Sequence, residues 1–495
     1  MTGIANVWEL ATRNMRQSGI AVAFVAIVAL FSVLNSNFLS PGNITNIVLQ
    51  YSYILILAIG MVLVIIGGHI DLSVGSLVAL TGAVAAVVVI KGGQPWWVGV
   101  LAAIGVGLLA GAWQGFWVAY VGIPAFIVTL AGMLLFRGLT HQVLDNVSLS
   151  PFGGTYYEIA NGFQNGLLGG MGFDVFTLVI FAIAVVGYAV TQWRSRLAKL
   201  RYQQVVESLP LFVVKIVIVA AIVMWFAWQL AHSRGLPNVL ILLAILIIGY
   251  SVIAQRSVFG RHIYAIGGNL HAAQLSGVKV KTLNFWVMAN MGFLSAVAGI
   301  VYSSRMNGAQ PGAGNMFELD AIAACFIGGA AVTGGVGRVT GAMIGGLIMA
   351  VMSNGMQLMG VDQSVQQVVK GLVLLLALLT PPLAMGLLLA TMYGPYGPAG
   401  SLLERAGLLL TNSPPAFVMA QFYAALPYYV IAARAAFEGV QPMRSAARWR
   451  SCPAGPIPPP SCSTRSAIPS SWSMRMTGSC SRMRMRRISS APARR

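Results

Sequence analysis

Charged side chains are the scarcest feature of this 495-residue chain, because only 8% of its residues are Asp, Glu, Lys or Arg. Soluble domains carry about 25%, so a chain this poor in charge cannot cover a water-facing surface. Hydrophobic residues make up 57%, and the mean hydropathy is +0.80. The apolar runs are continuous rather than alternating, which disfavours membrane strands. The sequence therefore predicts an all-α, polytopic membrane protein.

Cysteine and the motifs of enzyme chemistry are also nearly absent. Cys325 is alone in the apolar part, and Cys452, Cys462 and Cys480 lack metal-ligand spacing, so neither a disulfide framework nor a zinc site is expected. The phosphate-binding pattern GxxxxGK(S/T) does not occur, and no catalytic triad or carboxylate pair stands out. We expect no catalytic residues, no metal and no cofactor bound by this chain, and an enzymatic function is disfavoured.

Acidic residues are few, at 11 against 30 basic ones, which gives a formal net charge of +19. Over a whole chain, such a balance would indicate nucleic-acid binding. The charge is concentrated, however. The segment 441–495 holds eleven arginines without lysine or acid, so it supplies +11 of the total. The rest of the chain is only mildly basic, and no nucleic-acid partner is expected.

Apolar segments long enough for whole or half membrane helices recur along the chain at about 20 residues each. They predict ten to twelve transmembrane or re-entrant helices. Glycine interrupts the sequence around 66–76 and 319–341, which suggests half-helices there. The segments lie at 19–37, 47–66, 73–90, 97–120, 124–140, 173–191, 210–231, 237–254, 284–303, 319–336, 340–358 and 364–379.

Basic residues are unevenly distributed among the predicted loops. The segments 192–209 and 255–283 each contain four, whereas the alternate loops carry them singly. Cytoplasmic loops are enriched in Lys and Arg, so the N-terminus is predicted to be cytoplasmic and the first helix to be retained in the membrane. The long polar loop 141–172 then faces outside. It is either a binding or gating loop or a disordered connector.

The motif GGHIDLSVGS (67–76) places the only acid between Glu9 and Asp145 within an apolar region. A charge at the centre of a lone helix costs about 2.5–3.5 kcal/mol, and the surrounding glycines and serines allow the helix to break instead. The acid can then cap the following helix or line a polar translocation pathway, and the two roles are compatible. The candidate residues are Asp71, Ser73, Gly75 and Ser76.

Two further motifs stand out. ELDAIAACFIGGAAVTGGVGRVTG begins with Glu318 and Asp320, which are predicted at an outer mouth. GRHIYAIGGNLHAAQLSGVKV (260–280) predicts a short amphipathic helix that lies on the membrane surface or docks into a groove of a partner; a solvated loop is the alternative. Close helix packing is predicted for three glycines at four-residue spacing, Gly107, Gly111 and Gly115.

Together, these motifs resemble the ribose/xylose-type permeases of bacterial ABC sugar importers. The resemblance rests on GGHIDLSVGS, VGIPAFIVTLAGMLLFRGL (121–139), FGRHIYAIGGNLHAAQLSGV and ELDAIAACFIGG, and covers about 20–379 in order. It implies a type II ABC importer-like bundle that carries D-xylose, ribose or a similar monosaccharide across the inner membrane by alternating access. It also implies a permease homodimer, a periplasmic sugar-binding protein, and a cytoplasmic ATPase with tandem nucleotide-binding halves that uses the ATP.

The resemblance also maps the family's ATPase-coupling segment onto this chain. It falls on Ala272, Ala273, Ser276 and Gly277, and His271 replaces the acid that often precedes the alanine pair. Two other classes of function stay open. One is an ion-coupled secondary transporter, for which His69 and Asp71 would be a weakly supported pair of ion-coupling residues. The other is a non-transporting fusion product of two permease genes.

The chain departs from this family after Leu379. Residues 380–440 resemble an internal piece of molybdate/sulfate-type ABC permeases, through a Pro-Pro pair, a GPxG turn and AQFYAALPYYVIAARAAFE. The stretch 441–495 cannot bury a core; it is either a basic arm for lipid headgroups or nucleic acid, or the product of a shifted reading frame. We predict a sugar-permease membrane domain at 1–379, a partial second-permease-like segment at 380–440, and a disordered tail.

Overall fold

The computed structural model describes residues 15–170, 172–202, 204, 206 and 208–375, and it describes side chains from residue 23 onward. All of these residues belong to one compact unit, Met1–Pro381. The predicted segments 380–440 and 441–495, and the junction after Leu379, lie outside the described residues.

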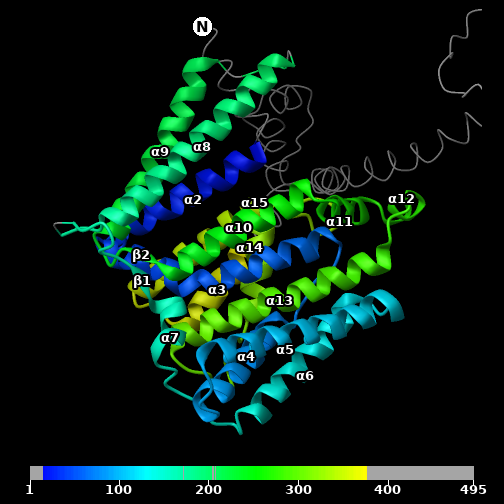
Figure 1. Ribbon diagram of the computed structural model, residues 1–495. Coiled ribbons are helices and arrows are strands. Elements are labelled where there is room, and N and C mark those ends of the chain that lie inside the picture. Colours follow the sequence, from blue (N-terminus) through cyan, green and yellow to red (C-terminus); the bar gives the residue numbers. More distant parts are fainter. Residues whose placement is uncertain (1–14, 171, 203, 205, 207, 376–495) are drawn as a thin grey trace, which may run out of the picture. The chain divides into compact units, whose positions relative to one another are not determined.

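The described part of the chain is mainly helical and has only two short strands, which confirms the predicted all-α polytopic fold (Figure 1). Within it, nine helices are long and apolar enough to cross a membrane. The short strands β1 (Phe163–Gln164) and β2 (Leu236–Pro237) pair antiparallel. The helices are α2 (Met15–Leu34), α3 (Pro41–Ile66), α4 (Val74–Ala86), η1 (Val87–Lys91), α5 (Trp96–Phe116), η2 (Trp117–Val121), α6 (Ala125–Val143), α7 (Gly154–Asn161), α8 (Val175–Arg201), α9 (Leu209–Ala231), α10 (Asn238–Arg256), α11 (Val258–Gly268), α12 (Leu270–Leu275), α13 (Val280–Met306), α14 (Phe317–Ile327) and α15 (Val339–Leu358), followed by a helical stretch at 363–375.

Each of the twelve predicted apolar segments overlaps a helix, and both predicted glycine breaks are present. Helix α3 ends at Ile66 and α4 begins at Val74, with non-helical backbone between them. Because α3, and α4 together with η1, are each long enough to cross a membrane, the half-helix interpretation of 66–76 is wrong. Helix α14 has only 11 residues, about 16 Å at 1.5 Å per residue, which is too short to cross a bilayer. The chain then turns through 328–338 before α15 begins, so the half-helix interpretation of this region is confirmed.

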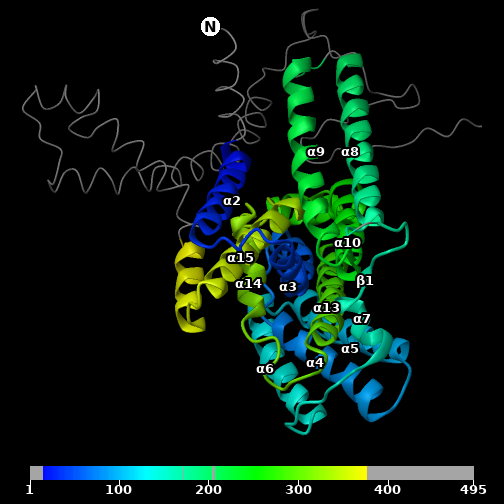
Figure 2. The ribbon, with the colours of Figure 1, turned by 90° about the vertical axis from the view of Figure 1, so that its left-hand side faces the viewer.

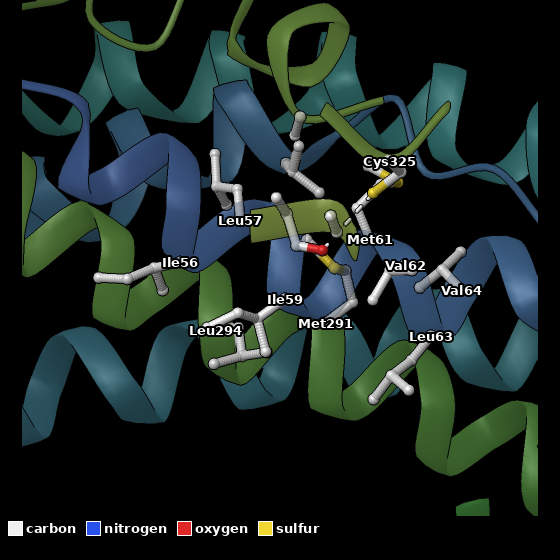
Figure 3. Close-up of a cluster of buried hydrophobic side chains, with 14 of the residues drawn as sticks. Ile56, Leu57, Ile59, Met61, Val62, Leu63, Val64, Met291, Leu294 and Cys325 are labelled. Carbon is white, nitrogen blue, oxygen red and sulfur yellow. Dashed lines mark hydrogen bonds between the residues drawn. The ribbon is translucent and has the colours of Figure 1, made fainter. Parts of the chain in front are cut away.

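Helix α3 forms the centre of the described bundle and packs against α10, α13, α14 and α15. Figure 2 shows it nearly end-on among them. Figure 3 shows buried side chains that point outward from several sides of α3, with Met291 and Leu294 of α13 and Cys325 of α14, which belong to the same hydrophobic cluster. The Cys325 thiol donates a hydrogen bond to the carbonyl of Ala58 at 3.5 Å. A helix that is apolar on every side is a buried one, which explains the unbroken hydrophobicity of this segment.

Helices α5 and α13 cross at glycine residues. A Cβ atom on Gly111 would meet backbone atoms of Met288, and one on Gly107 would meet the carbonyl of Gly292. Gly115 is likewise in close contact with α13, so the close packing predicted from the glycine spacing is confirmed. Lipid gives little hydrophobic drive for helix association, so van der Waals contact between close backbones stabilises this crossing.

The described residues of the loop 141–172 are folded, so the disordered-connector alternative is wrong. It contains α7, which packs on the end of α13. The Tyr156 hydroxyl lies 2.8 Å from the Ser303 hydroxyl, and the amide of Ala160 donates to the Ser304 hydroxyl at 2.9 Å. The pairing of β1 with β2 anchors the loop a second time. The described part of the loop therefore packs over the end of α13 that carries Ser303 and Ser304.

Candidate functional site

The non-helical stretch between α3 and α4 carries an acid into the protein interior. Asp71 is only 1% exposed. Its Oδ1 atom accepts hydrogen bonds from the Ser73 amide at 2.8 Å and from the Ser73 hydroxyl at 2.7 Å. Helix α4 begins at Val74, and Ser73 before it has helical backbone and makes no side-chain cap bond. The bond that Asp71 accepts from the Ser73 amide is of the kind expected of a capping acid, because an aspartate side chain readily bonds the backbone two positions on.

Two neighbouring helices complete this polar group, which we name the Asp71 cluster: Asp71, Ser73, Gln114 and Thr129. The Gln114 amide of α5 donates to the Ser73 hydroxyl at 2.6 Å, and the Thr129 hydroxyl of α6 lies 3.3 Å from the carbonyl of Ile70. All four side chains are buried. An unpaired polar group in hydrocarbon costs several kcal/mol, so this pairing allows the break in the helix and links α4, α5 and α6.

Gly75 and Ser76 lie buried in the first turn of α4. A Cβ atom on Gly75 would collide with the carbonyl of Gly314 and with the carboxylate of Glu318. Because glycine has no side chain, the loop before α14 packs directly against the backbone of α4 at this position. Through this contact the tertiary structure brings Glu318 next to the Asp71 cluster, although about 240 residues of sequence separate them.

Glu318 and Asp320 both lie in the first turn of α14, but they face different partners. Glu318 is half-buried against α4, near Arg137 of α6, whose guanidinium donates to the carbonyls of Pro311 and Ala313. The Asp320 carboxylate accepts instead from Lys370 in the stretch 363–375. The structure therefore joins Glu318, but not Asp320, to the Asp71 cluster.

The amphipathic segment 260–280 forms most of α11 and all of α12, and the predicted coupling residues lie in α12 and directly after it. The Asn269 side chain caps α12 by accepting from the Ala272 amide at 2.9 Å. Ala273 is 3% exposed and anchors the helix to the core, whereas Leu275 is 90% exposed. Ser276 and Gly277 are exposed after it, and Gly277 has a φ of 84° that favours glycine. The solvated-loop alternative is wrong, since the segment is an anchored helical projection.

Sequence reasoning missed three polar residues that the structure ties to these sites. Gln114, Arg137 and Lys370 each interrupt a predicted apolar segment. A lone polar residue within a span is itself a signal of a buried partner. Their partners come from distant parts of the chain, however. The sequence therefore indicates that these residues have buried partners but does not show which residues those partners are.

A bundle of apolar spans with a broken helix and paired polar groups in its interior is the architecture of a membrane transport protein. The chain belongs to the family described as branched-chain amino acid transport system / permease component, whose profile matches residues 43–378. No solved structure matches it.

Among curated proteins, the chain is similar to sugar permeases. It is 41% identical to the xylose transport system permease protein XylH of Escherichia coli over 369 residues, which are 74% of this chain and 92% of that protein. It is 41% identical to XylH of Haemophilus influenzae, over 75% of this chain and 97% of the relative. It is 36% identical to the ribose import permease protein RbsC of Escherichia coli, over 72% of this chain and 91% of the relative.

Proposed function

We propose that this chain is the permease subunit of a binding-protein-dependent ABC importer that carries a monosaccharide inward by alternating access. D-xylose is the first candidate substrate and ribose or a similar sugar the second. The observation that carries the proposal is the similarity to the xylose permeases, at 41% over nearly their whole length against 36% for the ribose permease. The broken helices support it, because such breaks occur where a membrane protein builds a transport path.

The same proposal assigns the energy source and the partners. ATP would be used by a separate cytoplasmic ATPase with tandem nucleotide-binding halves, and this chain would have no ATPase site. A periplasmic binding protein would deliver the sugar, and a second copy would complete a homodimer in the inner membrane. The enrichment of basic residues at 192–209 and 255–283 supports a cytoplasmic N-terminus.

Ala272, Ala273, Ser276 and Gly277 would form the contact with the ATPase. The buried Ala273 and the exposed Leu275 support this role, because they give α12 one anchored face and one face free to enter a groove. A Leu275→Asp substitution tests it by placing a charge in the groove. We expect loss of ATPase co-purification and of uptake, while the matched change Gln274→Asp on the same exposed helix has a small effect.

The two acidic motifs would serve the transport path in different ways. We expect no sugar contact from the four residues of the first motif, because all of them are buried. Their role would be to hold in place the helices that line the path; they are Asp71, Ser73, Gly75 and Ser76. Glu318 and Asp320 would mark its outer mouth, where both are partly exposed.

Uptake of labelled xylose tests the function in cells that lack their own xylose importers. The chain is expressed with its ATPase and binding protein, and uptake is expected to require both. Uptake that persists without the ATPase would identify an ion-coupled transporter instead. The chain ended after Leu379 is measured in parallel. If neither form transports xylose or ribose, although both insert into the membrane, the chain is a non-transporting fusion product.

A further inference from the structure

A cavity of about 520 Å³ opens where the end of α10 meets α11 and the loop before α15. The Tyr264 hydroxyl of α11 donates to the carbonyl of Gly337 at 2.7 Å and ties two of its walls together. We name it the arginine cavity; its lining residues are Ala254, Gln255, Arg261, Tyr264, Gly337 and Arg338.

The arginine cavity carries two guanidinium groups and no acidic side chain in its lining. Arg261 and Arg338 are both exposed, and among the described residues no carboxylate pairs with either. Arg261 also donates to the carbonyl of Arg256 at 3.1 Å, which holds its side chain against the end of α10. The planar fork of a guanidinium matches the oxygens of a phosphate, so the cavity is suited to a phosphate-bearing anion.

An apolar stripe on α10 leads directly to this cavity. Ile245, Ile248 and Val252 are 63%, 66% and 48% exposed. With Gln255 they recur at spacings of three and four residues, so all four lie on one face of the helix. From Ile245 to Gln255 this face extends about 15 Å at 1.5 Å per residue. A ligand with an anionic head and apolar chains would contact both the cavity and the stripe.

We propose that the arginine cavity binds the phosphate of an anionic phospholipid, with the acyl chains along the apolar stripe of α10. The lipid belongs to the leaflet on the side of α11 and α12. Arg261 and Arg338 hold the phosphate, and the Gln255 amide is placed to donate to the headgroup. The stripe lies on a candidate membrane span and the cavity at its end carries two arginines without a paired carboxylate, so charge complementarity beside an apolar surface favours an anionic lipid. The bound lipid joins α10, α11 and the loop before α15 near the helices that carry the coupling segment.

Photocrosslinking of the full-length chain in nanodiscs tests this site. A photoactivatable phosphatidylglycerol is expected to label residues 245–255 at least about ten-fold more than the matched phosphatidylcholine, because each basic residue near the surface adds to the attraction. The double variant Arg261→Gln/Arg338→Gln is expected to remove that preference. The double Lys variant, which keeps both charges, is expected to retain most of it, and Arg194→Gln on α8 serves as the remote control.

Several outcomes would overturn the proposal. Equal labelling by the two lipids, or an unchanged preference in the double Gln variant that still unfolds like the parent, excludes a headgroup site. Binding of inorganic phosphate to the parent but not to the double Gln variant, together with equal labelling by the two lipids, identifies a small-anion site instead. Absence of label on the α10 stripe from either lipid means that protein covers it.

Discussion

The Nζ atom of Lys370 lies 3.1 Å from Oδ2 of Asp320, and both side chains are only about one fifth exposed, at 22% and 21%. This ion pair joins the stretch 363–375 to the first turn of α14. A carboxylate and an ammonium group held at such depth stabilise each other, and removal of one leaves the other without a partner.

The first prediction concerns this pair. Lys370→Gln is expected to lower the free energy of unfolding by about 1–3 kcal/mol, less than the 3–5 kcal/mol of a fully buried pair because some solvent reaches both groups. The matched control is Lys91→Gln, which breaks an exposed pair with Asp145, at 62% and 74% exposure; a change below about 1 kcal/mol is expected. Equal losses in a denaturant titration of the two variants would contradict the assignment.

The second prediction separates a positioning role of Asp71 from proton or ion coupling. Asp71→Asn keeps an acceptor oxygen for the Ser73 amide and hydroxyl, whereas Asp71→Ala leaves both donors unpaired at a cost of about 1–3 kcal/mol. We expect the Asn variant to keep sugar uptake within about three-fold of the parent and the Ala variant to lose stability and uptake together. A well-folded Asn variant that cannot transport would show that the charge itself is needed.

The third prediction tests the α5–α13 crossing. Gly111→Val places two methyl groups against the backbone of α13 and is expected to lower unfolding free energy by at least about 1–3 kcal/mol. Gly105→Val is the matched control, because Gly105 lies on the same helix and a Cβ atom there meets nothing within 4 Å. Thermal unfolding in detergent measures both, and a control as unstable as Gly111→Val would mean that valine disturbs the helix itself.

The fourth prediction concerns pH and the loop before α8. Asp174, which is 7% exposed, precedes α8 and accepts from the amides of Thr177 and Gly166 at 2.8 and 3.0 Å. Burial acts to raise the pKa of Asp174, but the hydrogen bonds from the Thr177 hydroxyl and from these amides outweigh it, so the pKa lies below its usual value. Its ionised form therefore contributes stability above the unfolded pKa of about 3.9, and this contribution is lost as the pH falls through the folded pKa.

Comparison of the parent with Asp174→Asn checks this effect, since asparagine is also a good N-cap. The parent is expected to be the more stable between about pH 5 and 7, by about 1 kcal/mol for the charge-assisted bonds. That advantage is expected to shrink once the pH falls below about 4. Stability is measured by denaturant titration at each pH, and an advantage that grows towards acid pH would contradict the sign.

The membrane helices were largely predictable, because each span has to satisfy its own backbone hydrogen bonds and therefore appears as a local apolar run. The break before α4 was predictable for the same reason, since an acid between glycines and serines does not fit a continuous helix. The role of this acid at the start of α4 is predictable too, but only the folded backbone decides that its partners are the amide and the hydroxyl of Ser73.

The sequence by itself determined the helical segments, the glycine positions that admit close packing, and the motifs shared with sugar permeases. Only the tertiary structure decided that Glu318 lies on Gly75, that Gln114 completes the Asp71 cluster, and that Lys370 binds Asp320. The reason is physical: hydrophobicity and backbone bonding act within a segment, whereas a polar side chain inside a membrane protein takes its partner from whichever helix packs beside it.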